Sequence, residues 1–167
     1  MDATTLRETQ APLKQAYRDD PARARTPLHA EAEYADPGVT ATVRTWAGPV
    51  RAGLHRATGG DGADACSGDM LMEALLACAG VTLRSVATAM GVELRSAALT
   101  ADGVFDARGT LGVDRTVPVG VTDVVVTATL DTAADDASLE RLAAATERYC
   151  VVGQSLATPA TFVVRRG

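Results

Sequence analysis

A long apolar segment constrains the fold of this chain more than any other feature. Residues 70–92 are almost all apolar or small, which is enough for about six turns of α-helix. Glu73, Thr82, Arg84 and Ser85 interrupt the segment before it reaches the unbroken apolar length of a membrane span. The segment therefore predicts a buried central helix.

A helix that is apolar on nearly every face needs cover on all sides, and one small sheet covers only one of them. We expect the remaining face to pack against a second copy of the chain in an obligate, symmetric homodimer. Small residues that would allow two such helices to approach closely are Ala74, Ala77, Ala79, Gly80 and Ala87.

Composition excludes several classes of partner. The chain has 167 residues, which suits one domain. Its 16 Lys and Arg face 21 Asp and Glu, no basic cluster stands out, and only 4% of residues are aromatic. This argues against nucleic acid and anionic membranes as partners. No secretory signal is evident at the N-terminus, so a cytoplasmic location is expected.

The remaining segments predict an α+β fold, an antiparallel sheet packed on a long central apolar helix. Helical spacing over residues 5–24 predicts an N-terminal helical arm, residues 1–26, ahead of a single domain, residues 27–167. A second helix is expected at 133–149. Alternating residues predict strands at 28–35, 39–46, 50–56, 92–105, 117–130 and 158–165, with a turn at Asp36-Pro37-Gly38.

The ends of the central helix also carry signals. Ser67 is expected to be its N-cap, with Asp69 in the first turn at the positive end of the helix dipole. Gly91 is expected just past its C-terminus. The stretch before it, residues 57–66, is rich in Gly and Asp and predicts an irregular surface loop; it lacks the lysine that a phosphate-binding loop needs.

Two cysteines are the candidates for chemistry. Cys78 shares one face of the central helix with Leu71, Leu75, Thr82 and Ser85. It is either a small core residue or a nucleophile shielded by apolar surroundings. Cys150 follows the second helix, where we expect its side chain to be partly exposed. A peroxide-oxidised thiol needs such a partner, because a sulfenic acid without a resolving thiol goes on to irreversible oxidation.

Other candidates remain open. Cys66 is either a simple loop thiol or a competitor of Cys150. His29 and His55 lie on predicted strands and are more simply structural. A zinc site formed by Cys66, Cys78, Cys150 and His55 has suitable ligand types but no CxxC pair.

The sequences around both cysteines resemble a known family. Residues 67–87, SGDMLMEALLACAGVTLRSVA, together with residues 147–156, ERYCVVGQSL, are similar to the OsmC/Ohr family of thiol-dependent hydroperoxide reductases. The order of helices and strands and the distance between the cysteines also match. The resemblance covers roughly Leu28 to the end of the chain, and the N-terminal arm lies outside it.

The resemblance implies an intertwined homodimer with a site at each subunit interface. Cys78 would be the peroxidatic thiolate that attacks the O–O bond, and Cys150 would form the resolving disulfide. The implied substrates are organic hydroperoxides, and the implied reductant is a dithiol such as a lipoyl group. No metal and no bound organic cofactor is implied.

The chain departs from the family pattern at the residues that activate the thiol. The family's helix usually begins with a Pro and a Glu about nine residues before the first cysteine, where this chain has Gly68 and Asp69. Asp69 is therefore the acid expected to orient a catalytic arginine.

The arginine itself is missing from the first hairpin turn, where the family carries it. Arg44, Arg51 and Arg56 are the candidates to replace it, although each could simply be a solvated strand residue. The alternative is a dimeric protein that keeps the fold for small-ligand binding or interaction and lacks efficient peroxidase activity.

Overall fold

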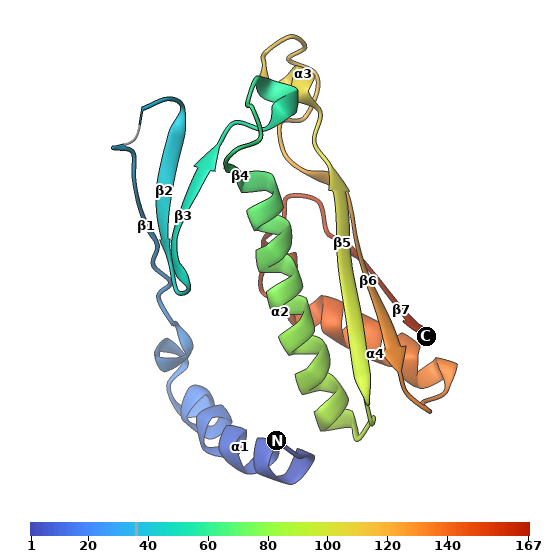
Figure 1. Ribbon diagram of the computed structural model, residues 1–167. Coiled ribbons are helices and arrows are strands. Elements are labelled where there is room, and N and C mark those ends of the chain that lie inside the picture. The colour runs from blue at the N-terminus through green and yellow to red at the C-terminus, as the bar shows by residue number, and fades with distance from the viewer. Residues whose placement is uncertain (36) are drawn as a thin grey trace.

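The computed structural model describes residues 1–35 and 37–167 (Figure 1). The chain begins with α1 (Ala3–Asp19) and a 3₁₀ turn, η1 (Pro21–Ala24). The Asp2 side chain caps α1 by accepting a hydrogen bond from the Thr5 amide at 2.8 Å. Pro12 lies inside α1.

The first sheet contains β1 (Glu31–Glu33), β2 (Thr40–Thr45), β3 (Gly48–Gly53) and β4 (Ala65–Cys66). β2 pairs antiparallel with β1 and β3, as predicted, and the predicted turn at Asp36 lies outside the described residues. No residue of β1, β2 or β3 is buried. In Figure 1 these three strands stand away from the second sheet.

The expectation of an irregular loop at 57–66 was partly wrong. The segment begins in a 3₁₀ turn, η2 (Arg56–Thr58), and ends in β4, which pairs parallel with β3 by placing Cys66 opposite Gly53. A bulky residue is excluded at Gly60, where a Cβ would lie 1.7 Å from the Leu54 carbonyl oxygen. Because it pairs with Gly53, Cys66 is fixed at the end of a strand and does not lie in a loop.

The apolar segment forms α2 (Ser67–Met90), a helix of 24 residues. Gly91 ends it in the left-handed conformation, φ 70°, as predicted. The N-cap is Cys66 and not Ser67, because Cys66 keeps the extended conformation of β4 while Ser67 is already helical. By length and composition α2 could cross a membrane.

One face of α2 is packed and the other is open. Leu75, Ala79, Leu83 and Ala87 recur every fourth residue and are buried. Val81, on another face, is 73% exposed. The expected buried helix is thus buried on one side within a single chain.

The second sheet contains β5 (Ser96–Val104), β6 (Thr122–Asp131) and β7 (Thr161–Arg166). β6 alternates buried and partly exposed residues along most of its length and runs antiparallel to β5. β7 is parallel to β6, so the predicted antiparallel sheet was wrong for this pair of strands. The chain between them forms α4 (Asp136–Tyr149), which is the crossover connection that two parallel strands need. A short helix that the sequence did not predict, α3 (Ala107–Thr110), lies between β5 and β6.

Two apolar clusters lie between α2, α4 and the second sheet. The first gathers around Leu83, Leu130 and Leu142. The second gathers around Leu75, Val126 and Cys150, and Cys78 packs against it. The α+β fold therefore brings both candidate cysteines to one cluster.

Candidate active site: paired thiols between α2 and the end of α4

The position of Cys78 follows from the helical period of α2. It lies on the same side as Leu71 and Leu75, which directs it toward the second apolar cluster. Its side chain is partly buried and free of any disulfide. Cys78 is thus held in apolar surroundings while part of it stays open, as a shielded nucleophile requires.

Cys150 is the residue that caps the C-terminus of α4, and it is completely buried. The expectation that it would be partly exposed was wrong. After α4 the chain forms a 3₁₀ turn, η3 (Gly153–Ser155), and this turn packs against the Cys150 thiol and shields it from solvent. The Gly153 amide donates a hydrogen bond to the Cys150 sulfur at 3.4 Å.

The two thiols contact each other through a hydrogen bond, and their pKa values move in opposite directions. Burial raises the pKa of Cys78, but hydrogen bonds from the Val152 amide, the Cys150 thiol, the Thr82 hydroxyl and the Val151 amide together lower it below the ordinary value. Cys78 is therefore the thiol that ionises first.

Burial, followed by the neighbouring Cys78, raises the pKa of Cys150, although the Gly153 amide opposes this change. Cys150 therefore holds its proton more tightly than Cys78 does, and its S–H group is the donor of the hydrogen bond to the Cys78 sulfur. The pair is therefore polarised, because the thiol on α2 loses its proton more readily than the thiol at the end of α4.

None of the three candidate arginines is among the groups that shift the pKa of Cys78. Arg44 lies 3.7 Å from the Glu33 carboxylate on β1, and Arg51 pairs with Asp64. Arg56 packs against Gly62 and lines a small hollow together with Asp69 and Cys66. The structure thus places the arginines near the first sheet and the start of α2.

Asp69 does not join the thiol pair. It lies in the first turn of α2, as predicted, more than two turns before Cys78. In the described parts of the chain it forms no ion pair with an arginine. Its hollow is shared with Arg56 and Glu73, so the acid and the cation are neighbours without being paired.

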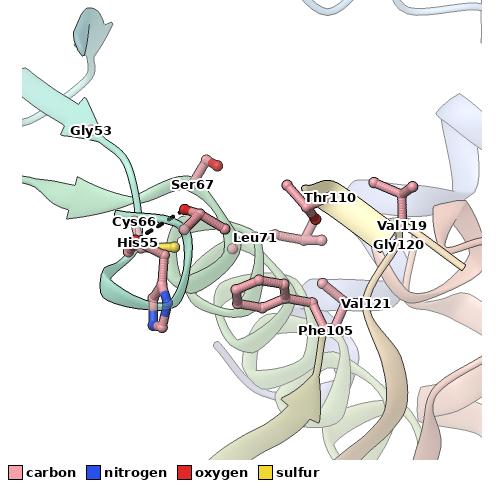
Figure 2. Close-up of a pocket in the computed structure, with 12 residues that line it drawn as sticks. Gly53, His55, Cys66, Ser67, Leu71, Phe105, Thr110, Val119, Gly120 and Val121 are labelled. Atoms are coloured by element: carbon pink, nitrogen blue, oxygen red, sulfur yellow. Dashed lines mark hydrogen bonds between the residues drawn. The ribbon is translucent and has the colours of Figure 1, made fainter. Parts of the chain in front are cut away.

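A cavity of about 340 Å³ lies at the N-terminal end of α2, and Cys66 is in its wall (Figure 2). The rings of His55 and Phe105 meet there edge to face, 5.2 Å apart. The His55 Nδ1 accepts a hydrogen bond from the Ala57 amide at 3.0 Å, so His55 is held in place by its own turn. Cys78 does not line this cavity, but Val121 lines it and also packs in the cluster around Cys150.

The predicted alternative of a zinc site finds no support. Among residues 1–35 and 37–167, no group of three or more His, Cys, Asp or Glu is arranged to hold a metal ion. Cys66 is at the start of α2, twelve residues before Cys78, which corresponds to about 18 Å along a helix. The four ligands of the predicted zinc site therefore form two separate pairs, Cys66 with His55 and Cys78 with Cys150.

Most of the groups that lower the pKa of Cys78 could not be predicted from the sequence. The amides of Val151 and Val152 carry no signal in the sequence, because any residue supplies an amide. Thr82 lies on the predicted helix face, and its hydroxyl is one of the groups that lower the pKa of Cys78. Its spacing of four residues from Cys78 was the available signal.

The fold and the paired thiols define a class of α+β proteins in which one cysteine lies on a central helix and a second meets it from a later helix. A family described as OsmC-like protein matches residues 60–165 of this chain. The chain belongs to the OsmC-like family. The match begins after β3, so α1 and the first three strands precede it.

Solved structures support the same fold. An OsmC-like protein of unknown function from Vibrio cholerae is 14% identical, with a TM-score of 0.67 over 84% of this chain and 99% of the other. An organic hydroperoxide resistance protein OsmC from Legionella pneumophila is 16% identical, with a TM-score of 0.61 over 86% and 99%.

The organic hydroperoxide resistance protein OhrB of Bacillus subtilis is 13% identical, with a TM-score of 0.60 over 84% of this chain and 98% of the other. No curated protein matches the sequence. At these identities the likeness defines the fold.

Proposed function

We propose that this protein reduces organic hydroperoxides, with Cys78 as the nucleophile and Cys150 as the resolving thiol. The observation that carries the proposal is the hydrogen-bonded pair itself, a thiol with a lowered pKa next to a buried thiol with a raised pKa. Two structural neighbours named as hydroperoxide resistance proteins are consistent with it.

The first step is oxidation of Cys78. The thiolate sulfur attacks the terminal oxygen of the hydroperoxide, an S–O bond forms and the O–O bond breaks. The sulfur is oxidised to a sulfenic acid by two electrons, and the alkoxide that leaves takes up a proton and becomes the alcohol. The apolar cluster around Cys78 favours a substrate with a hydrocarbon group over hydrogen peroxide.

The second step forms the disulfide. The Cys150 sulfur attacks the sulfur of the sulfenic acid, an S–S bond forms, and the hydroxyl leaves as water with the proton from Cys150. A dithiol reductant, of the lipoyl type by family resemblance, then exchanges with the disulfide, restoring both thiols and becoming a disulfide itself. Three free cysteines suit a reducing compartment such as the cytoplasm.

We further propose that the working form is a homodimer. Trp46 on the turn after β2 is fully exposed in the single chain, and no residue of β1–β3 is buried. A second copy of the chain would cover two exposed surfaces, the first sheet and the face of α2 that carries Val81. Sedimentation equilibrium at micromolar concentration is expected to give twice the mass of the chain, and a monomer would contradict the proposal.

The experiment that tests the activity is stopped-flow consumption of cumene hydroperoxide and of hydrogen peroxide by the fully reduced protein. Cys78→Ser is the test variant and Cys66→Ser the matched control, since both thiols lie on or next to α2 and both are partly buried. We expect fast, selective loss of the organic peroxide that Cys78→Ser abolishes and Cys66→Ser retains.

A second candidate function is supported by the absence of a guanidinium among the groups that shift the pKa of Cys78. In that case the fold serves as a small-ligand binding or interaction module. Reaction of Cys78 with hydroperoxide no faster than that of free cysteine would favour this second function and overturn the first.

A further inference from the structure

The cavity at the N-terminal end of α2 is enclosed by parts of the chain that lie far apart in the sequence (Figure 2). Its walls come from the end of β3, from η2, from the start of α2, from α3 and from the loop before β6. Its volume of about 340 Å³ lies in the range in which proteins hold small molecules. The thiol pair does not use this cavity, because Cys78 and Cys150 are not among the residues that line it.

The cavity has largely apolar walls. Leu71, Phe105, Val119 and Val121 supply hydrocarbon surface, and none of the described residues that line it is an aspartate, glutamate, lysine or arginine. The adjoining hollow differs, because it is lined by the charged residues Arg56, Asp64, Asp69 and Glu73. A charged ligand would lose its hydration in the cavity without gaining an ionic partner, so the cavity suits an uncharged ligand.

The start of α2 brings hydrogen-bond donors to the wall. Ser67 contributes a hydroxyl and Cys66 a thiol. The first amides of a helix have no partner within the helix, and Cys66, the N-cap residue, makes no side-chain hydrogen bond to them. A ligand oxygen that accepts a hydrogen bond, such as that of a ketone, would meet these donors.

Two features keep the cavity open and favour a flat ligand. A Cβ at Gly68 would lie 3.5 Å from the Cys66 sulfur, so a longer side chain at this position would take up space beside the thiol. The rings of His55 and Phe105 are held edge to face in the wall, and His55 is bonded to the turn that follows it. Aromatic rings pack well against other aromatic rings, and a preformed wall lowers the entropy cost of binding.

We propose that this cavity is a binding site for an uncharged aromatic compound that carries a carbonyl oxygen and is about as large as a naphthalene ketone. The site is separate from the thiol pair, because Cys78 follows Leu71 by seven residues, which corresponds to about 10 Å along α2. The proposal goes beyond the reduction of hydroperoxides, since binding requires neither a peroxide nor a change in the redox state of Cys78.

The test uses prodan, an uncharged naphthalene ketone whose fluorescence shifts to shorter wavelengths when it leaves water. The reduced full-length protein is titrated with prodan and, for comparison, with the anionic probe anilinonaphthalene sulfonate. We expect saturable binding of prodan and a Kd for the sulfonate that is at least about tenfold higher. Absence of saturable prodan binding, or equal affinity for the two probes, would overturn the proposal.

Two substitutions in the wall test where prodan binds. Val119→Phe and Gly68→Leu each enlarge a residue that lines the cavity, and both should weaken prodan binding at least about fivefold. Val113→Phe is the matched control, because Val113 is exposed in the same loop but does not line the cavity. Gly68→Leu also raises the helix propensity of α2, so it makes the comparison even if Val119→Phe fails to fold. Unchanged binding in Gly68→Leu would contradict the proposal.

Alkylation of the cysteines locates the bound probe independently. Saturating prodan should slow the alkylation of Cys66 by iodoacetamide at least about threefold and leave that of Cys78 unchanged, as measured by mass spectrometry of the two peptides. An unprotected Cys66 would place prodan elsewhere, for example between two copies of the chain, and protection of Cys78 as well would join the cavity to the thiol pair. Either result overturns the proposal. No readout uses a hydroperoxide, so the result stands whether or not the protein reduces peroxides.

Discussion

Cys66 and Cys78 lie at the start and in the middle of α2, and their surroundings differ. Cys66 caps its N-terminus beside a cavity, with His55 in the same wall and Arg56 in the adjoining hollow. Cys78 lies in the middle of the helix, against apolar side chains, with a second thiol and several hydrogen-bond donors as neighbours. Both are partly buried. The proposed function assigns the redox chemistry to Cys78, which has a second thiol and hydrogen-bond donors as neighbours, and not to Cys66, which lies beside a cavity and a cation.

The largest effect expected from this comparison is that of Cys78→Ser. The oxygen is a far weaker nucleophile than the thiolate, so hydroperoxide reduction should fall at least a thousandfold, to the background rate. Cys66→Ser should retain at least half of the wild-type rate. Peroxide consumption measured with a ferrous xylenol orange assay checks both, and equal losses in the two variants would erase the distinction between the two settings.

Cys150→Ser should separate the two chemical steps. The first turnover is expected to continue, because Cys78 remains, but multiple turnover with a dithiol should fall at least tenfold as the sulfenic acid proceeds to the sulfinic acid. Mass spectrometry of the Cys78 peptide should show two added oxygen atoms after excess peroxide. Undiminished steady-state turnover would assign the resolving role elsewhere, with Cys66 as the first alternative.

The pH dependence of the pair follows from the opposite pKa directions. Hydrogen bonding lowers the pKa of Cys78, so its thiolate fraction and alkylation rate should level off below the ordinary cysteine value of about 8.5. Burial raises the pKa of Cys150, so its own alkylation should still be rising above that pH. Peptide-resolved alkylation from pH 5 to pH 10 measures both, and the reverse order would exchange the two roles.

The smallest effect concerns the turn that covers Cys150. A Cβ at Gly153 would lie 3.3 Å from the Cys150 sulfur, so Gly153→Ala should displace the thiol by a few tenths of an ångström and lower the free energy of unfolding by about 1 kcal/mol. Gly120→Ala is the control, since nothing lies within 4 Å of its added Cβ. Urea unfolding compares them, and equal stabilities would show that the turn yields without cost.

The sequence predicted the elements whose period is long and regular. The apolar run of α2 was found close to its expected bounds, because burial on a defined face sets its period. The strand predicted at 117–130 was found as β6, which begins five residues later, at Thr122, and ends at Asp131. β4 was missed because its two residues form a strand only by pairing with β3. α3 was missed because a helix of four residues is too short to show a helical period. Cys66 became the N-cap of α2 for the same reason, since its pairing with Gly53 on β3 extends the strand to that point.

The candidate site was predictable in its sulfur atoms but not in their surroundings. The two thiols lie together, as the family resemblance implied, because α4 packs on α2 and ends beside Cys78. Local reasoning gave Cys150 too much exposure, because it could not foresee that η3 folds back over the thiol. The roles considered for Arg44, Arg51 and Arg56 depended on the placement of the first sheet, which no local pattern encodes.

The central claim is that Cys78 and Cys150 form one redox pair, and disulfide mapping tests it most directly. The reduced protein is treated with one equivalent of cumene hydroperoxide, free thiols are blocked, and the digested peptides are analysed by mass spectrometry without reduction. The account predicts a Cys78–Cys150 disulfide with Cys66 blocked as a free thiol. A disulfide that contains Cys66, or three free thiols after the peroxide has been consumed, would contradict it.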